Sequence, residues 1–272
     1  MKEITVEQAI EIRKNLLQVF HELCEKNDLK YSLGYGTLLG AVRHGGMIPW
    51  DDDIDVVMPR EDYDRLAAMY TDSESKEQYQ LVNHRNHPEV KTKISYFIDY
   101  DTVTETAGKL NDYHGIHIDI YPVDVLPNGF LKKKFMLLKR YILQKIIKIK
   151  DLHPEVVKGK QRAIRKTLMF LFKGFDQDKM LDRLNSLARK FASVPEEQKK
   201  TVSCFVEEGK MISFPYEAMK HRRLYSYDGK EYYGFDDFDS LLSAWYGDYM
   251  TPPPADQRKR SEHRWVKYYY KA

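Results

Sequence analysis

The feature that most constrains the fold of this chain is a dense run of carboxylates at the start of an apolar segment. Residues 50–58 read Trp-Asp-Asp-Asp-Ile-Asp-Val-Val-Met, and Pro59 follows. Carboxylates packed this closely repel one another, and burying them is costly unless a cation compensates their charge. Because apolar residues alternate with the acids as they do in a strand, we predict that the run enters a buried strand over 53–58, which Pro59 ends.

An extended backbone places residues i and i+2 on the same face of a strand. We therefore expect Asp53 and Asp55 to point together, with Asp51 just before them on the same side. Hard oxygen ligands at this spacing suit Mg²⁺, with Mn²⁺ as a second choice, and several convergent carboxylates can hold one or two ions. The side chains expected to point the other way, into the core, are Ile54, Val56 and Met58.

A second strand offers one more carboxylate. Residues 116–121 alternate, so that three isoleucines face one way and His117, Asp119 and Tyr121 face the other. Asp119 is the best candidate for a further metal ligand, because apolar neighbours flank it and it faces away from them. A single buried aspartate is equally typical of a structural hydrogen-bond acceptor, so both roles stay open for Asp119.

The acidic run has two other interpretations. A run of aspartates on a surface loop is often simply solvated, but Ile54, Val56 and Val57 favour a buried strand. Residues 51, 53 and 55 also match positions 1, 3 and 5 of a calcium-binding EF-hand loop. That loop needs Gly at position 6 and Glu at position 12, where this chain has Val56 and Asp62. The calcium loop is therefore excluded.

A glycine-containing turn precedes the acidic run. After a predicted strand over 30–33 come Gly34-Tyr35-Gly36-Thr37, with Thr37 expected to cap a short helix over 38–43 that stops at Gly45. Backbone N–H groups at such a helix start can bind a phosphate. The turn is neither a P-loop nor a dinucleotide fingerprint, because the lysine and the third glycine are missing. Arg43 and His44 could add positive charge for donor phosphates, although His44 could equally cap the surface.

The remaining pattern predicts helices that alternate with short strands, which is an α+β class with a mixed sheet. Thr5 and Gln8 form a capping-box pattern at the start of a helix over 5–28. The stretch 201–239 is mixed. The other predicted elements are strands at 79–83, 93–100 and 116–121, and helices at 61–70, 131–150, 160–173, 177–192 and 241–246.

Charge is distributed unevenly along the 272 residues. Residues 125–175 carry 14 Lys/Arg and two acids, whereas the remainder has a net charge of −9. Residues 131–150 hold eight Lys/Arg, no acid and one apolar stripe. Such a helix lies on an anionic membrane surface, or packs on a core with a solvated basic face. A nucleic-acid partner is disfavoured, because the acidic remainder would repel phosphates. The stripe comprises Leu131, Phe135, Leu138, Ile142, Ile146 and Ile149.

The two cysteines, Cys24 and Cys204, make neither a disulfide framework nor a zinc site, so we expect a reducing, cytoplasmic compartment. The first residues have early acids and no apolar core, which is unlike a secretory signal. No run of about 18 apolar residues predicts a membrane-spanning helix.

Several segments resemble the LicD family of bacterial phosphocholine transferases, which are distantly similar to the fukutin-related ribitol-phosphate transferases. Gly-Thr-Leu-Leu-Gly-Ala-Val-Arg-His-Gly-Gly at 36–46 and Ile-Pro-Trp-Asp-Asp-Asp-Ile-Asp at 48–55 look like the family signature. Residues 115–124 look like its later acidic strand. Residues 246–258 are similar to its C-terminal block, with Pro252 where an apolar residue is expected. Residues 130–210 match only in general character.

The resemblance implies an α+β, nucleotidyltransferase-like fold, with a mixed β-sheet flanked by helices and a helical insertion. Residues 1–128 would form the catalytic core, 129–200 a basic helical insertion, and 201–272 a C-terminal part that completes the catalytic domain.

The resemblance also implies a reaction. CDP-choline or a similar CDP-alcohol would be the donor, CMP would be released, and a sugar hydroxyl of a teichoic acid, lipopolysaccharide or capsule would accept the phosphoalcohol. Because such acceptors are lipid-linked, residues 131–150 would contact the inner face of the cytoplasmic membrane. Asp53 and Asp55 would bind the metal, with Asp51 and Asp119 as further ligands, either of which could take the acceptor proton.

The donor would be held by the glycine turn, the nearby cations and the aromatic side chains. Arg43 would assist the leaving CMP, and choline's quaternary ammonium would favour an aromatic cage, for which Tyr96 is one more candidate. The donor-binding residues implied are Gly36, Thr37, Arg43, His44, Trp50, Tyr35, Tyr121 and Arg258.

Two rival functions use the same carboxylates. A nucleotidyltransferase would attach the nucleotide itself to its substrate and release pyrophosphate. A non-catalytic, metal-dependent glycan-binding or assembly module would bind without turnover. The products distinguish the first rival, and the absence of turnover distinguishes the second.

Overall fold

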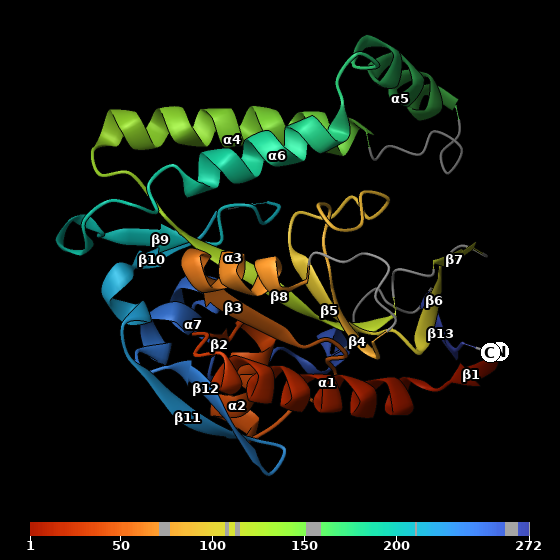
Figure 1. Cartoon of the computed structure of the whole chain (residues 1–272), viewed down its shortest axis with the longest axis vertical. Helices are drawn as coiled ribbons and strands as arrows, with labels where there is room; N and C mark the ends of the chain where they lie inside the picture. Colours follow the sequence, from red (N-terminus) through yellow and green to blue (C-terminus); the bar gives the residue numbers. More distant parts are fainter. Residues whose placement is uncertain are drawn as a thin grey trace.

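The acidic run lies at the start of a central strand in a mixed sheet. The computed structural model describes residues 1–70, 77–106, 109–111, 115–150, 159–209, 211–258 and 266–271. The sheet has the strand order β10-β9-β8-β3-β2, and β5 pairs with β8 and with β4 (Figure 1). Only β3 and β8 pair in parallel among these neighbours. The strands are β2 (Ser32–Leu33), β3 (Asp55–Pro59), β4 (Tyr79–Val82), β5 (Ser95–Asp99), β8 (Ile116–Val125), β9 (Thr201–Ser203) and β10 (Ser213–Pro215).

The predicted alternation of 116–121 in β8 is confirmed, whereas in β3 the consecutive residues Val56, Val57 and Met58 are all buried. Ile116, Ile118 and Ile120 are fully buried, whereas the residues between them are partly exposed. The strand that follows the acidic run begins later than predicted, at Asp55, so residues 51–54 form a loop. The Asp51 N–H donates to the carbonyl of Ile48, so a turn over 48–51 leads into this loop.

Helix α1 (Val6–Lys26) packs against β5 and β8, and α3 (Arg60–Met69) packs against β3 and β8. The capping box at the start of α1 is confirmed, since the Thr5 hydroxyl accepts from the N–H of Gln8 and the Gln8 side chain accepts from the N–H of Thr5. The buried side of α1 supplies Leu16, Leu17 and Phe20 to the main core.

Helix α2 (Tyr35–His44) starts earlier than predicted. Its N-cap is Gly34, so the prediction that Thr37 caps it is wrong. Thr37 lies inside the first turn, and its hydroxyl instead accepts a hydrogen bond from the N–H of Asp55 at 2.8 Å. The predicted stop is confirmed, because Gly45 ends the helix with φ of 68°, a left-handed conformation that glycine adopts without strain.

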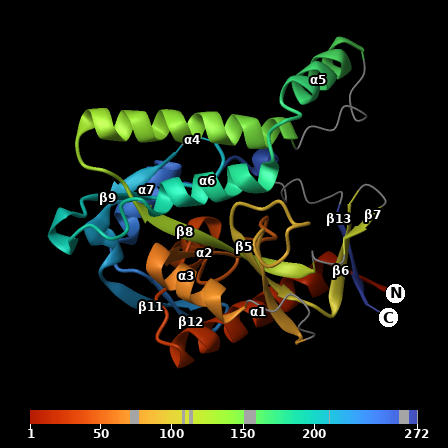
Figure 2. The ribbon, with the colours of Figure 1, turned by 45° about the horizontal axis from the view of Figure 1, so that its top comes forward.

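Three helices form a separate layer above the sheet (Figures 1 and 2). They are α4 (Phe130–Lys150), α5 (Gly159–Leu171) and α6 (Gln177–Arg189). Helices α4 and α6 pack together through a second core cluster that includes Met136, Ile147 and Leu184. Most of the apolar stripe predicted on α4 does not join this core, because the helix packs through its opposite side.

The C-terminal part returns to the core beside the acidic run. The hairpin of β11 (Arg222–Tyr227) and β12 (Lys230–Phe235) and helix α7 (Phe238–Tyr246) pack against α2 and β2. Short 3-10 helices cover Glu196–Gln198, Tyr216–Met219 and Ala255–Gln257. A second sheet brings the two ends of the chain together: β1 (Lys2–Ile4), β13 (Val266–Tyr270), β6 (Thr102–Thr106) and β7 (Lys109–Asn111).

The structure confirms the α+β class with a mixed sheet flanked by helices. The division into 1–128, 129–200 and 201–272 stays a prediction. Within the described residues, none of the helices combines the length and the apolar character that crossing a membrane requires.

Candidate metal and donor site

Two carboxylates lie side by side because two strands are in register. Asp55, the first residue of β3, pairs directly with Asp119 of β8. The N–H of Asp119 donates to the carbonyl of Ile54 at 2.9 Å, and the N–H of Gly34 donates to the carbonyl of Asp55 at 2.9 Å. Backbone hydrogen bonds on both sides therefore fix the main chain from which the Asp55 and Asp119 side chains project.

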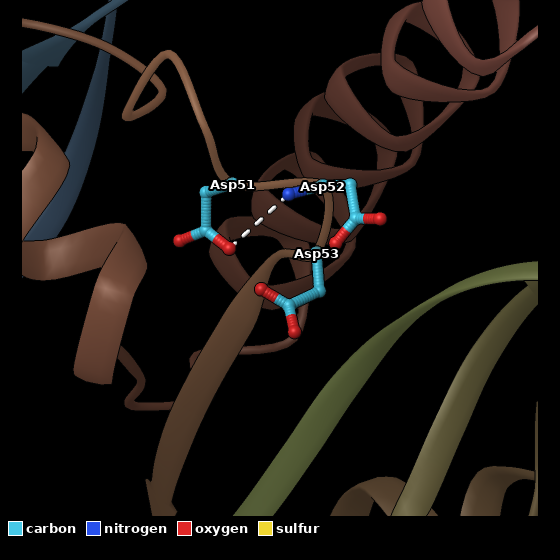
Figure 3. A group of neighbouring side chains, drawn as sticks. All are labelled: Asp51, Asp52 and Asp53. Carbon is cyan, nitrogen blue, oxygen red and sulfur yellow. Dashed lines mark hydrogen bonds between the residues drawn. The ribbon is translucent and has the colours of Figure 1, made fainter. Parts of the chain in front are cut away.

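The loop before β3 brings three more carboxylates together. Asp51, Asp52 and Asp53 each place one carboxylate oxygen so that all three atoms lie within 4.8 Å of one another (Figure 3). The N–H of Asp52 donates to Oδ1 of Asp51 at 3.1 Å and helps to hold the turn. Asp52 was not predicted as a site residue, because the i, i+2 rule for a strand skips it and does not apply to a loop.

The electrostatics of this group favour a bound cation. Burial, followed by the charges of Asp53, Asp119 and Asp51, raises the pKa of Asp55 well above its ordinary value. Burial and the Asp53 carboxylate raise the pKa of Asp51 to about 7. Like charges this close disfavour ionisation unless a counter-charge enters. All the donors are hard carboxylate oxygens, so the residues present fit Mg²⁺ or Mn²⁺.

The glycine turn packs directly against the acids. A Cβ added to Gly36 would lie 2.6 Å from Oδ2 of Asp51, so no larger residue fits there without moving that carboxylate. Behind it, Thr37 is almost fully buried and bonds the backbone of Asp55. The turn therefore positions the carboxylates as well as presenting the start of α2.

An aromatic group with one acid lies near Asp55 and Asp119. The Tyr35 hydroxyl donates to Oε2 of Glu207 at 2.5 Å, and its ring stacks on Trp245 at 4.4 Å. The ring of Tyr121 is 5.0 Å from that of Tyr35, and its hydroxyl lies 3.4 Å from Oδ2 of Asp119. We name Tyr35, Tyr121, Trp245 and Glu207 the tyrosine–glutamate cluster.

Glu207 was missed by the sequence analysis. It lies in the mixed stretch 201–239, far along the chain from the acidic run, and no local pattern marks it. Burial raises its pKa above the ordinary value. Its charge also contributes to the raised pKa of Asp55, which shows that it belongs to the same electrostatic group.

His117 and Tyr96 extend the site along β8 and β5. Nε2 of His117 lies 3.5 Å from Oδ1 of Asp119, and its ring is 4.7 Å from that of Tyr96. The predicted outward side of β8 therefore gathers His117, Asp119 and Tyr121 beside one another.

A pocket of about 400 Å³ opens next to Asp51. One wall comes from the predicted signature, with Gly36, Arg43 and Trp50, and the other comes from the C-terminal block. The sequence points to the residues of this second wall only through the family resemblance of the C-terminal block. The C-terminal residues that line the pocket are Tyr246, Asp248, Tyr249, Thr251 and Pro253.

Cations gather at the Trp50 side of this pocket. The guanidinium of Arg258 lies 5.2 Å from the centre of the Trp50 ring, and the His44 ring meets Trp50 edge-on at 5.8 Å. Arg43 donates to the carbonyl of Tyr249 at 2.5 Å. Burial and then the charge of Arg258 lower the pKa of Arg43, and burial and then Arg43 lower the pKa of His44. The crowding of positive groups suits an anionic ligand.

The predicted donor-binding residues thus separate into two places. Gly36, Arg43 and Trp50 line the pocket, and His44 and Arg258 contact Trp50. Tyr35 and Tyr121 instead belong to the tyrosine–glutamate cluster, and neither lines that pocket.

Comparison with known proteins gives the family. Residues 28–156 match the model of the LicD/FKTN/FKRP nucleotidyltransferase domain. The chain is 29% identical over 264 residues to the lipopolysaccharide cholinephosphotransferase LicD of Haemophilus influenzae, covering 95% of this chain and 96% of that protein. An uncharacterized protein of Rickettsia prowazekii is 31% identical over 126 residues, or 46% of this chain and 38% of that protein. Residues 28–156 of this chain therefore form a nucleotidyltransferase domain of the LicD/FKTN/FKRP type, and similarity to a LicD protein extends over nearly the whole chain.

Proposed function

We propose that this protein is a transferase that moves phosphocholine, or a similar phosphoalcohol, from a CDP-alcohol to a sugar hydroxyl of a cell-surface glycan and releases CMP. The observation that carries the proposal is the carboxylate group beside a pocket that Arg43 also lines, with Arg258 against the ring of Trp50 in the same pocket wall. The near full-length similarity to the cholinephosphotransferase of Haemophilus influenzae supports phosphocholine and a lipopolysaccharide-type acceptor.

Asp51, Asp53 and Asp55, with Asp119, would hold Mg²⁺ or Mn²⁺ in this proposal. When bound, the ion would supply positive charge to the diphosphate oxygens of the donor. Asp52 joins the set because its carboxylate lies within 4.8 Å of those of Asp51 and Asp53.

The pocket beside Asp51 would take the nucleotide part of the donor. Arg43 and Arg258 supply charge for the phosphate of the leaving CMP, and the start of α2 at Gly36 adds backbone N–H groups. The acceptor hydroxyl then loses its proton to Asp119 or Asp51, and its oxygen forms the new bond to the choline-bearing phosphorus as the bond to CMP breaks.

The tyrosine–glutamate cluster is the proposed site for the choline head. A quaternary ammonium is attracted by aromatic faces and by a carboxylate that water does not screen. Tyr35, Tyr121 and Trp245 supply rings, and the half-buried Glu207 supplies the charge.

The substitution Glu207→Gln tests this assignment, because it removes the charge and keeps an acceptor for the Tyr35 hydroxyl. We expect kcat/KM to fall by about 10-fold with CDP-choline, with little change for the uncharged alcohol of CDP-ribitol. An equal loss with both donors would contradict the assignment and leave Glu207 a purely structural acceptor.

The reaction itself is tested by offering CDP-choline, CDP-ethanolamine, CDP-ribitol and CDP-glycerol with Mg²⁺ and a glycan acceptor. CMP release is measured with and without EDTA, and Mn²⁺ is added back to the treated sample. Asp53→Asn should abolish release, whereas the exposed Asp236→Asn should not. If a competent acceptor is present and none of the four donors yields CMP, the proposal fails.

The same assay separates the two rival functions. Pyrophosphate release from CTP and a phosphoalcohol would identify a nucleotidyltransferase. Metal-dependent glycan binding without any product, weakened but not abolished by Asp53→Asn, would identify a binding module.

A further inference from the structure

An apolar stripe runs along the exposed side of α4. The side chains of Leu131, Phe135, Leu138 and Ile142 are 78%, 59%, 53% and 49% exposed. The helix packs on α6 through a different line that contains Met136 and is almost fully buried. The first four residues of the stripe therefore face outward, whereas Ile146 joins the core that α4 shares with α6.

Lysines border the stripe. The ammonium groups of Lys134, Lys139 and Lys145 lie 5.9, 4.5 and 5.2 Å from the ring centres of Phe130, Phe135 and Tyr141. Long basic side chains that lie along apolar groups keep their charge at the edge of a buried patch. Because residues 130–150 include no acid, the charge on this face is of one sign.

Helix α5 also combines exposed apolar side chains with basic ones. It contacts α4, and among the described residues none on α5 is buried (Figure 2). Ile164, Phe170 and Leu171 are 50%, 66% and 64% exposed, and Lys173 lies 4.8 Å from the Phe170 ring centre. Residues 159–175 also include no acid. A helix that buries nothing in its own protein has an apolar side left for a partner.

We propose that this α4–α5 face docks on an anionic phospholipid bilayer, with both helices lying in the plane of the interface. Exposed Leu, Ile and Phe side chains would enter the head-group boundary, and the lysines beside them would meet lipid phosphates. A second copy of the chain fits less well, because a symmetric contact would bring two basic stripes together. A nucleic acid would leave the apolar stripe in water.

The buried side of the same helix connects this face to the candidate site. Arg140 donates through Nε to the carbonyl of Phe205 at 2.7 Å and through Nη2 to that of Glu207 at 2.5 Å. Helix α4 therefore stands between the docking face and the loop that carries Glu207. On the basis of the proposed function, docking would present a lipid-linked acceptor within reach of the carboxylates.

The test is sedimentation of the full chain with vesicles of phosphatidylcholine and phosphatidylglycerol, and with vesicles of phosphatidylcholine alone. We expect binding to the anionic vesicles that weakens as salt is raised. The pair Leu138→Ser and Ile142→Ser should lower that binding by about 10-fold or more, as should the pair Lys134→Glu and Lys139→Glu. The matched control is Met69→Ser with Leu224→Ser, two equally exposed apolar residues elsewhere, which should bind like the unaltered protein.

Two results would overturn the docking proposal. One is failure of the unaltered protein to bind anionic vesicles, or equal binding by Leu138→Ser/Ile142→Ser. The other is a dimer in analytical ultracentrifugation that this pair abolishes, which would assign the face to a second copy. Thermal melting shows that each variant is folded. Vesicle binding needs no turnover, so it can hold even if the proposed reaction fails.

Discussion

Asp55 is a carboxylate whose surroundings oppose its own charge. The residue lies opposite Asp119 and near Asp51 and Asp53, and burial adds to their repulsion. A group in this position does not stabilise the metal-free protein. A bound cation explains why an aspartate is present at position 55. This residue therefore serves function and not the stability of the metal-free protein.

Asp55→Asn should therefore act in opposite directions on activity and stability. We expect CMP release with Mg²⁺ to fall by about 100-fold or more, because a metal ligand is lost. In EDTA the variant should melt at or above the temperature of the unaltered protein, because the amide is neutral. If it melts far lower in EDTA, the carboxylate is a structural acceptor and the metal assignment fails.

Asp51 gives a prediction for pH. Its pKa is raised from an ordinary value of 3.8 to about 7. A raised native pKa means that the associated stability is complete below pH 4 and is lost as pH rises through about 7. The metal-free protein should thus melt lower at pH 8 than at pH 5.5, and added Mg²⁺ should raise the melting temperature more at pH 8, where fewer protons compete.

Asp51→Asn is the variant that checks this effect. It removes one titrating carboxylate, so the difference in melting temperature between pH 5.5 and pH 8 should shrink in EDTA. An unchanged difference would mean that Asp51 does not titrate in this range.

Some of these residues were predictable and others were not. The acidic run can be recognised from the sequence alone, because carboxylates beside buried apolar residues need a cation that compensates their charge. Asp52 is not predicted by the i, i+2 rule, which holds for a strand and not for a loop. Glu207 has no local signal in the sequence. Its place is set by Arg140 and Gln144, whose side chains donate to its backbone carbonyl from a helix more than sixty residues earlier.

At the scale of elements, a buried ion pair joins α3 to β8. The guanidinium of Arg60 donates to both oxygens of Asp124, at 2.6 and 2.9 Å, and both side chains are buried. Burial opposes the charge of Asp124, and Arg60 offsets it. The pair holds the end of β8 against the first turn of α3, just beyond the strand segment that carries Asp119.

Breaking this pair should destabilise the protein strongly. We expect Asp124→Asn to lower the free energy of unfolding by about 3–5 kcal/mol, because the buried Arg60 loses its two-bond carboxylate partner and, among the described residues, keeps only Asp64 at 3.8 Å as an ion-pair partner. The double change Arg60→Leu with Asp124→Leu should cost less than the single one. The control is Lys91→Met at the Lys91–Asp178 pair, which is exposed on both sides and should cost below about 1 kcal/mol. Denaturant unfolding measures all three, and similar losses for Asp124→Asn and Lys91→Met would contradict the argument.

The elements that the sequence predicted well are those with local signals. The capping box located α1, and alternation located β8, because both depend on residues a few positions apart. The sheet β1-β13-β6-β7 pairs segments from opposite ends of the chain, so no local pattern could find it. On α4 the periodicity gave the helix but not its buried side, which is chosen by Met136, Arg140 and Ile147.

At the scale of the whole molecule, Arg140 and Gln144 of α4 both bind the loop that carries Glu207. Arg140→Met should remove the two bonds that Arg140 makes to the carbonyls of Phe205 and Glu207. We expect turnover with a water-soluble acceptor to fall by about 10-fold, with vesicle binding unchanged, because the outward side of α4 is untouched. Lys132→Met, an exposed change on the same helix, is the control for CMP release. Equal activity of the two variants would show that the loop keeps its place without Arg140.

Tyr35 has a consequence for how the protein is made. It opens α2 with φ of 41°, a left-handed conformation that a tyrosine adopts only when its surroundings hold it there. What holds it is Glu207 and Trp245, which are synthesised long after the glycine turn and the acidic run. A ribosome-bound chain with only its first two hundred residues would thus have every aspartate of the centre but would lack the two side chains that hold Tyr35 beside them. The complete site would therefore form late in synthesis and in a single step, when the last quarter of the polypeptide packs over the first.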